Sequence, residues 1–423
     1  MNFVTKFIQI NTLIAVIGLL LSCSTDYPEL GNDTIKKNKQ SGFSYLTIAE
    51  PTSVAFSAMN YIIKDEEMGG TRYLVISNDL GKTWKYLENS HGDPVFFHIF
   101  SNGEILYATT LGCYYIDNVL ASIQESQVTD YNGKPFESVA FNHFCQYADL
   151  RNIFHIVNGK EIVAWADYSF ARDSDPKYIA RMWYTTDYGR TVKCAIKFNE
   201  TKIDGKVQNV RHTHGLSYDP YTETFYIATG DGGLQCQLIK GNYNTEDDTW
   251  EFHRLGSGDN YKFGRIFFDK DYAYLITDYT TDLQRGIIKC PKDSLHNSST
   301  FEYLYSDPDN QALSCYTEDK NGNRILTGDY TGKGFIYYAN KDFTFKRIAT
   351  NRPSNTINGF TSPNSAGDIY ARLGTGVTTG IVTIGKLFNL TESMRQSGVT
   401  NFMVGDSNLS NNLIYNLDEG TKE

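Results

Sequence analysis

The chain has 423 residues, with 49 acidic side chains against 39 basic ones and a formal net charge of −10. This acidic balance, without any basic run, argues against a nucleic-acid partner. Tyr (30), Phe (25) and Gly (35) are abundant. Because aromatic residues favour strands and glycine supplies turns, the composition favours an all-β protein.

The first 22 residues have the pattern of a signal peptide. Lys6 supplies a short positive start, and residues 13–21 (LIAVIGLLL) form an apolar run too short to span a bilayer. The run leads into Ser22 and Cys23, and the sequence LLSC resembles a bacterial lipobox. We predict cleavage before Cys23, lipid attachment to its thiol, and a protein anchored to the membrane without spanning it. An ordinary secretory peptide with a chance cysteine is the alternative.

The residues after Cys23 form a polar segment. Residues 24–42 (STDYPELGNDTIKKNKQSG) carry almost no large apolar side chains and are typical of a tether. Asp26 and Glu29 follow the cysteine closely, as in some surface-export signals, so we expect the outer membrane or the cell surface. The predicted organisation is a signal peptide (1–22), a lipidated tether (23–42) and a single β domain with a C-terminal closing segment (43–423).

Six cysteines remain when Cys23 is set aside. None forms a CxxC pair, and each lies in an apolar, strand-like segment, so we predict buried free thiols, with an isolated disulfide as the alternative. The six are Cys113, Cys145, Cys194, Cys236, Cys290 and Cys315.

The body of the chain is built from repeats. Each repeat has a polar turn, an apolar strand ending near Thr or Gly, a short loop and a second apolar strand. The anchor threonines Thr229, Thr277 and Thr327 are 48 and then 50 residues apart. The copies lie at 53–88, 102–117, 158–170, 222–239, 271–290, 321–338 and 366–384, which makes seven units between about residues 43 and 400.

A period of about 50 residues with about four short strands is typical of propeller blades. One four-stranded sheet cannot bury both faces alone, so the units must stack around an axis. We therefore predict a seven-bladed β-propeller, with six blades as the second choice and a two-domain β-sandwich as the alternative. We expect a monomer, with Phe43–Ile48 as the strand that closes the ring.

Two short motifs occupy predicted hairpins. Residues 77–84 (SNDLGKTW) match the pattern S-x-D-x-G-x-T-W, and residues 185–192 (TTDYGRTV) are a degenerate copy. We expect Asp to cap a tight turn, Gly to take positive φ and Trp to pack on the sheet. The pattern resembles the Asp-box (BNR repeat) of sialidase-like propellers, which implies a peripheral, structural role. The matching residues are Ser77, Asp79, Gly81, Thr83 and Trp84, and then Asp187 and Gly189.

Histidines concentrate near the predicted inner strands. His98 and His155 take equivalent positions in neighbouring blades, and we predict that each bonds within a tight channel. His212 and His214 are two residues apart at the start of the fourth blade, so they project from the same face. His143 leads into the third blade.

Tyr261 and Arg265 open the predicted fifth blade. With His143, His212 and His214 they form our predicted catalytic set at the channel mouth. Such a set could remove a proton next to a carboxylate, neutralise that carboxylate and protonate a leaving oxygen.

The H-x-H pair also suits a divalent metal, with Asp231 as a third ligand. Zinc is the alternative to an acid–base role, and the sequence makes no cofactor certain.

A sialidase would need three arginines on the substrate carboxylate, the first in an Arg-Ile-Pro motif near the start of the propeller. Here no arginine precedes Arg72 and Arg-Ile-Pro is absent, so sialidase activity is not expected. In fold and residue type the chain is more similar to propeller polysaccharide lyases and rhamnose-glucuronate-cleaving enzymes. This implies an envelope lipoprotein acting on a uronate-containing polysaccharide or oligosaccharide, as a lyase or a glycosidase. A non-catalytic glycan-binding or scaffolding propeller is the alternative.

Overall fold

The computed structural model describes residues 36–417 with internal gaps. The gaps are 41–42, 48–50, 53, 93, 110–111, 118–124, 131, 137–151, 167–179, 209, 279–285, 307–311, 331–332, 352–356, 374–376, 382–395, 397, 399–400 and 405–412. Cys23 and its flanking segments, His143 and Cys145 therefore lie outside the described residues. Among the described residues, no helix is long and apolar enough to cross a bilayer.

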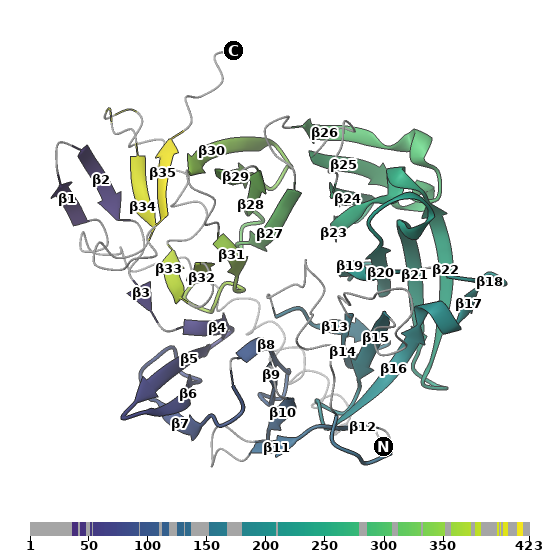
Figure 1. Cartoon of the computed structure of the whole chain (residues 1–423), viewed down its shortest axis with the longest axis horizontal. Helices are drawn as coiled ribbons and strands as arrows, with labels where there is room; N and C mark the ends of the chain where they lie inside the picture. Colours follow the sequence, from purple (N-terminus) through teal and green to yellow (C-terminus); the bar gives the residue numbers. More distant parts are fainter. Residues whose placement is uncertain are drawn as a thin grey trace, which may run out of the picture. The chain divides into compact units, whose positions relative to one another are not determined.

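From Lys36 onward the chain forms one compact unit, an all-β propeller with six blades arranged around a central axis (Figure 1). Each blade is a four-stranded antiparallel sheet from one continuous segment, and its first strand lies innermost. The first three blades are β4 (Val54–Ala58), β5 (Tyr61–Met68), β6 (Thr71–Ser77) and β7 (Lys85–Glu88); β8 (Pro94–Ile99), β9 (Ile105–Thr109), β10 (Cys113–Ile116) and β11 (Glu125–Gln127); and β13 (His155–Val157), β14 (Lys160–Ala166), β15 (Arg181–Thr185) and β16 (Thr191–Lys197).

The next three blades follow the same order. They are β19 (Thr213–Asp219), β20 (Thr224–Thr229), β21 (Gln237–Asn244) and β22 (Thr249–Ser257); β23 (Phe263–Phe268), β24 (Tyr272–Thr277), β25 (Gly286–Pro291) and β26 (Glu302–Ser306); and β27 (Ala312–Glu318), β28 (Arg324–Tyr330), β29 (Lys333–Ala339) and β30 (Phe345–Asn351). Short additions are β12 (Thr129–Asp130), parallel to β16, the hairpin β17 (Lys202–Ile203) and β18 (Lys206–Val207), and the 3-10 turns η4 (Phe198–Glu200), η5 (Gly233–Gln235), η6 (Asp259–Tyr261), η7 (Lys292–Ser294) and η8 (Ser298–Thr300).

The prediction of seven blades is not confirmed, and six, the second choice, are found. The last repeat forms a smaller sheet from β31 (Ile357–Phe360), β32 (Ile369–Leu373) and β33 (Val377–Ile381), completed by the two-residue β3 (Pro51–Thr52). It lies between the sixth and first blades, with β31 against β27 and β33 against β4. This unit thus takes its fourth strand from the N-terminal side of the propeller, the side from which we predicted a closing strand.

The predicted closing strand was wrong. β2 (Phe43–Thr47) pairs with β34 (Asn401–Val404), which continues through β35 (Leu413–Leu417) to β30 on the sixth blade, while β3 pairs with β33. β1 (Lys36–Gln40), inside the predicted tether, pairs with β2. Both N-terminal segments can form strands, so the choice of partner depends on which sheet edge each one reaches.

Apolar clusters fill the spaces between neighbouring blades. One cluster joins Ile63 of the first blade to Tyr107 of the second, and another joins Phe225 of the fourth to Met182 of the third; all four side chains are fully buried. Because both faces of a blade are covered, its central strands need continuous apolar sequence. The second strands β9, β20 and β24 are accordingly buried along almost their whole length.

The anchor threonines have a structural role. Thr229 donates from Oγ1 to the carbonyl of Gln235 (2.8 Å), and Thr277 exchanges hydrogen bonds with the main chain of Gly286. Each thus ties the loop that joins the second and third strands of its blade. Four cysteines are free thiols, as predicted, namely Cys113, Cys194, Cys236 and Cys290.

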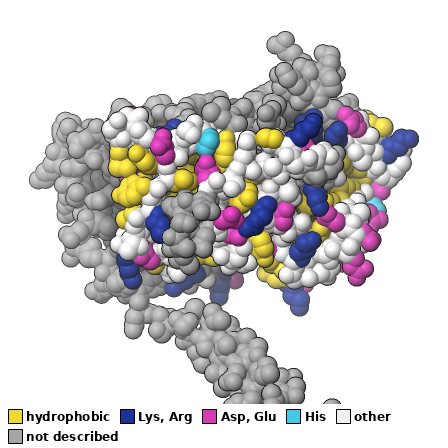
Figure 2. Space-filling model, turned by 90° about the horizontal axis from the view of Figure 1, so that it is seen from below, with side chains coloured by type: hydrophobic (Ala, Val, Ile, Leu, Met, Phe, Trp, Pro, Cys, Tyr) yellow, Lys and Arg dark blue, Asp and Glu magenta, His cyan; other side chains and the backbone are white. Residues whose placement is uncertain are grey.

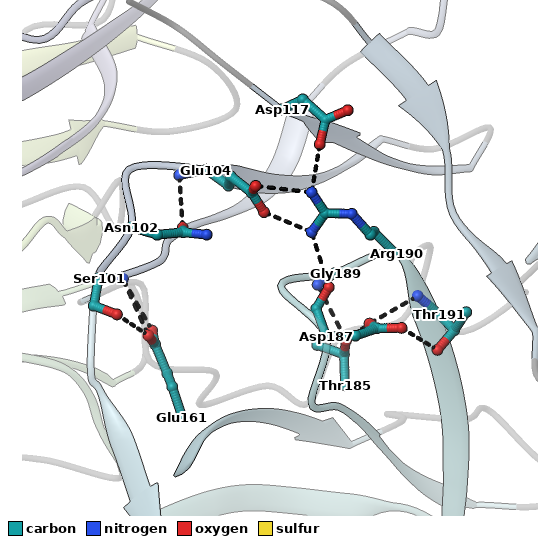
Figure 3. A network of polar contacts seen from close by, with 10 residues as sticks. All are labelled: Ser101, Asn102, Glu104, Asp117, Glu161, Thr185, Asp187, Gly189, Arg190 and Thr191. Atoms are coloured by element: carbon teal, nitrogen blue, oxygen red, sulfur yellow. Dashed lines mark hydrogen bonds and ion pairs between the residues drawn. The ribbon is translucent and has the colours of Figure 1, made fainter. Parts of the chain in front are cut away.

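The two Asp-box-like segments form matching turns on the outer hairpins. Asp79 accepts hydrogen bonds from the main chain and hydroxyl of Thr83 (2.9 and 2.7 Å), and Asp187 does the same with Thr191 (3.0 and 2.6 Å; Figure 3). Gly81 and Gly189 have φ of 85° and 86°. Trp84, the residue that the second turn lacks, lies under the Lys64 ammonium group.

On the face of the molecule that Figure 2 shows, neither positive nor negative side chains predominate. There, Lys and Arg side chains are interspersed with Asp and Glu over the described residues.

Candidate functional site

The site lies at the start of β19, the inner strand of the fourth blade. Opposite β20, Thr213 pairs with Thr229 and Gly215 with Ala228, so His214 is the extra residue of a β-bulge. Bulges re-aim side chains. The inner strands of five other sheets have a bulge at the corresponding place, where the residues are Ala55, Val95, Gly264, Ser314 and Asn358.

His212 and His214 point to the same place, as their spacing predicted. Their Nε2 atoms are 2.9 Å apart, and their rings stack with centroids at 4.9 Å. The side chains are 3% and 1% exposed. The two imidazoles are therefore almost completely buried, and their polar edges meet.

Asp231 completes this centre. Its Oδ1 lies 2.9 Å from His212 Nε2 and 3.2 Å from His214 Nε2, and its Oδ2 accepts a hydrogen bond of 2.9 Å from Arg211. It follows Gly230, whose φ is +80° and whose amide donates to the carbonyl of His212. Asp231 is 39% exposed, so the centre is open to solvent on one side.

The fifth blade supplies a second carboxylate. Asp278 follows β24 and places Oδ2 2.9 Å from His214 Nδ1, while Lys262 Nζ is 3.7 Å from the same oxygen. The two blades can meet here because β19 has Gly215, where any Cβ would collide with the Gly264 carbonyl of β23. The site thus combines residues from the fourth and fifth blades, near the ends where their inner strands begin.

Charge within the centre shifts two pKa values. Burial by itself lowers the pKa of His214, but its hydrogen bonds to Asp231 and Asp278 outweigh this and raise it above its ordinary value. The hydrogen bonds from His212 and His214 hold the pKa of Asp231 well below its usual range. Asp231 is therefore a carboxylate at neutral pH.

Three of these residues could hold a metal ion. One ligand atom from each of His212, His214 and Asp231 lies within 4.8 Å of the other two, as the sequence alternative required. Two imidazole nitrogens and one carboxylate oxygen form a donor set that suits zinc and other divalent first-row metals.

The structure does not unite the five predicted catalytic residues. Tyr261 packs in the apolar core, edge-to-face against Phe263 and Phe301. Arg265 lies over the ring of Tyr316 in the sixth blade. Both side chains are buried and pack against these aromatic rings, so the expectation that they share one pocket with the histidines is not confirmed. His143 lies outside the described residues.

His98 and His155 line a separate cavity of about 350 Å³ along the inner strands. His98 is buried and bonds to Glu161 of the next blade (3.4 Å), and burial lowers its pKa. His155 contacts the ring of Tyr218 at a tilt and the ring of Phe225 edge-to-face. Among the described residues, His212, His214, Tyr261 and Arg265 are not part of the cavity lining.

Sequence reasoning missed Asp278, Lys262 and the role of Arg211. A signal was present, because Asp278 directly follows the anchor Thr277, much as Asp231 follows Thr229 and Gly230. Aligning the residues that follow each anchor threonine would have found the second carboxylate.

No family model and no curated protein matches the sequence. Several solved propellers resemble the fold at low identity. The β-propeller domain of Myceliophteria thermophila Cps50 (Swd1) matches with a TM-score of 0.44, 12% identity and coverage of 82% of this chain and 100% of that one. Virginiamycin B lyase from Staphylococcus aureus matches with a TM-score of 0.42 and 9% identity, and the match covers 83% of this chain and 99% of that one. The extracellular domain of BT4673 from B. thetaiotaomicron matches with a TM-score of 0.41 and 10% identity. The match covers 84% of this chain and 40% of that one.

Proposed function

We propose that this chain is an exported lipoprotein, anchored through Cys23 to the cell envelope, that cleaves a uronate-containing glycan. The observation that carries the proposal is the meeting of two buried imidazoles and a half-exposed carboxylate at the channel mouth, the end where the inner strands begin. Such paired histidine and carboxylate groups, with pKa values shifted by their neighbours, are concentrated at functional sites of proteins.

Arg211 can bind the carboxylate of the substrate, a role that we expected from the predicted catalytic set. Its guanidinium is bound to Asp231 and its side chain is 46% exposed, so it can reach a ligand in solvent. A guanidinium pairs with carboxylates in bidentate fashion. A uronate carboxylate held there lies beside the histidine–carboxylate centre, which would supply the group that removes the α-proton or activates water.

The test is turnover of uronate polymers by the full-length protein in detergent. An unsaturated product absorbing in the near ultraviolet indicates a lyase, and new reducing ends alone indicate a hydrolase. The double variant His212→Ala/His214→Ala should lose about 100-fold or more in turnover, while His253→Ala, on β22 of the same blade, should retain it. Absence of turnover by the wild type, or full turnover in the double variant, would contradict the proposal.

Non-catalytic glycan binding is the second candidate, and the channel cavity favours it. Trp165, Tyr218 and Tyr316 line this cavity with other aromatic side chains, and sugar rings stack on such surfaces. If this candidate is correct, the wild type retains acidic oligosaccharides without cleaving them. Tyr221→Ala, at the cavity rim, then weakens retention, whereas His212→Ala does not.

A further inference from the structure

Two imidazole nitrogens and one carboxylate oxygen converge at the channel mouth, in an arrangement that suits a cation between them. The atoms are His212 Nε2, His214 Nε2 and Asp231 Oδ1, separated by 2.9, 2.9 and 3.2 Å. We infer that His212, His214 and Asp231 bind one divalent transition-metal ion, and that Zn²⁺ suits this donor set best.

Asp278 lies on the side of His214 that faces away from the other two atoms. Its carboxylate oxygen is 2.9 Å from His214 Nδ1, so the tautomer with hydrogen on Nδ1 faces a carboxylate and leaves the lone pair of Nε2 for a ligand. That lone pair faces another imidazole nitrogen and a carboxylate oxygen. A single hydrogen on His212 Nε2 cannot point well at both neighbours, whereas one metal ion satisfies all three atoms at once.

Asp278 also has the position of a supporting residue in metal sites. Histidine ligands commonly donate their second ring N–H to a carboxylate, which holds the ring and makes the nitrogen a better ligand. Lys262, 3.7 Å from Asp278, balances the charge of this second carboxylate. The site therefore has both ligands and an outer layer that orients one of them.

The spacing of the three atoms fits direct ligation. Zinc binds nitrogen and oxygen at about 2.0–2.1 Å, which places neighbouring ligands of a tetrahedral site about 3.3 Å apart. The observed separations of 2.9–3.2 Å need only small adjustments. A fourth position faces solvent beside the half-exposed Asp231, so a water molecule or a substrate oxygen could occupy it.

The β-bulge shows that the site is specific to one blade. Of the six inner-strand bulges that the structure describes, five carry Ala55, Val95, Gly264, Ser314 and Asn358, and the one in the fourth blade carries histidine. Packing of the repeat does not require an imidazole there. A ligand role accounts for its burial beside a second histidine and two carboxylates.

The experiment measures metal directly on the full-length protein in detergent, without a polyhistidine tag. The protein is stripped with EDTA, dialysed against ZnCl₂ or MnCl₂ alone, and its metal content is measured by mass spectrometry. We expect one equivalent of Zn²⁺ in the wild type and none retained in Asp231→Asn or His212→Ala. Asp278→Asn should bind about 10- to 100-fold more weakly, and His253→Ala should match the wild type.

Asp231→Asn protects the test against misfolding, because this side chain is partly exposed and the change keeps its size. No retained metal in the wild type, or undiminished retention in both Asp231→Asn and His212→Ala, would overturn the inference. The measurement needs no glycan. Metal binding without glycan turnover would thus leave this inference standing and refute only the proposed function, and the reverse holds for turnover without metal.

Discussion

Arg190 donates two hydrogen bonds of 2.7 and 2.8 Å to the carboxylate of Glu104 and so joins the third blade to the second (Figure 3). The same guanidinium also bonds to Asp117 (2.6 Å) and to the carbonyl of Asp187 within its own turn (3.1 Å). The degenerate Asp-box-like turn therefore does more than reverse the chain. It presents an arginine that links two blades, a role that its sequence did not indicate.

This link predicts a measurable coupling between the two residues. In a double-mutant cycle, Arg190→Ala and Glu104→Ala should each destabilise the protein, and the double variant by less than their sum, with a coupling of about 1 kcal/mol. The figure is modest because Arg190 is 38% exposed. Thermal unfolding measures all four proteins, and strictly additive effects would show that the pair contributes nothing.

Asp79 should make stability depend on pH in the acid range. Hydrogen bonds from the hydroxyl and main chain of Thr83, and from Ser77, hold its pKa at about 2 in the folded protein, against about 3.9 when unfolded. The contribution of the Asp79 carboxylate to the free energy of unfolding is therefore complete above about pH 4 and is lost as the pH falls toward 2.

We accordingly expect the melting temperatures of the wild type and Asp79→Asn to differ most at neutral pH and to converge near pH 2. Thr83→Val removes the hydrogen bond from the Thr83 hydroxyl, which is the largest contribution to the lowered pKa of Asp79. In that background the melting temperatures with and without the Asp79→Asn change should differ less. Turnover and metal content should be unchanged in both variants, since the turn lies on an outer hairpin. A gap that stays constant across the pH range would contradict this account.

Gly230 is expected to position the carboxylate of the site. It has φ of +80°, and a Cβ there would collide with the main chain of Gln235 and Cys236. Gly230→Ala should cost about 2 kcal/mol and weaken Zn²⁺ retention by displacing Asp231. Gly232→Ala is the matched control, because nothing lies near a Cβ at Gly232, and it should behave like the wild type in both measurements.

Tyr261 should act through packing and not through its hydroxyl group. Tyr261→Phe keeps the ring between Phe263 and Phe301, and we expect full activity with a loss of about 1 kcal/mol or less. Tyr261→Ala should lose about 3–5 kcal/mol by leaving a cavity. If turnover falls in the phenylalanine variant while its melting temperature is unchanged, the Tyr261 hydroxyl group takes part in the reaction.

Lipidation at Cys23 remains a prediction. Cys23→Ser should give an unprocessed or soluble protein that no longer partitions into detergent, because the lipid supplies the apolar surface that holds the mature chain to a membrane. Phase partitioning and the mass of the mature N-terminus measure this. Normal membrane association of the variant would count against a lipid anchor.

The sequence by itself determined the class of fold and the local chemistry. A repeat of about 50 residues with apolar middle strands predicts a propeller, and two residues of spacing predict that His212 and His214 share a face; both depend on short-range periodicity. Only the tertiary structure decided which segments complete the ring. Strand pairing between β3 and β33 depends on sheet edges that are far apart in sequence.

The same reason explains the site. Asp231 and Asp278 reach His214 from two different blades, after loops of different sequence, and Gly215 lets those blades approach. A pattern of residue types could not separate these partners from Tyr261 and Arg265, which also stand near the start of an inner strand. Tyr261 packs between the fourth and fifth blades and Arg265 against the sixth. Such packing is a property of the assembled ring and not of any single repeat.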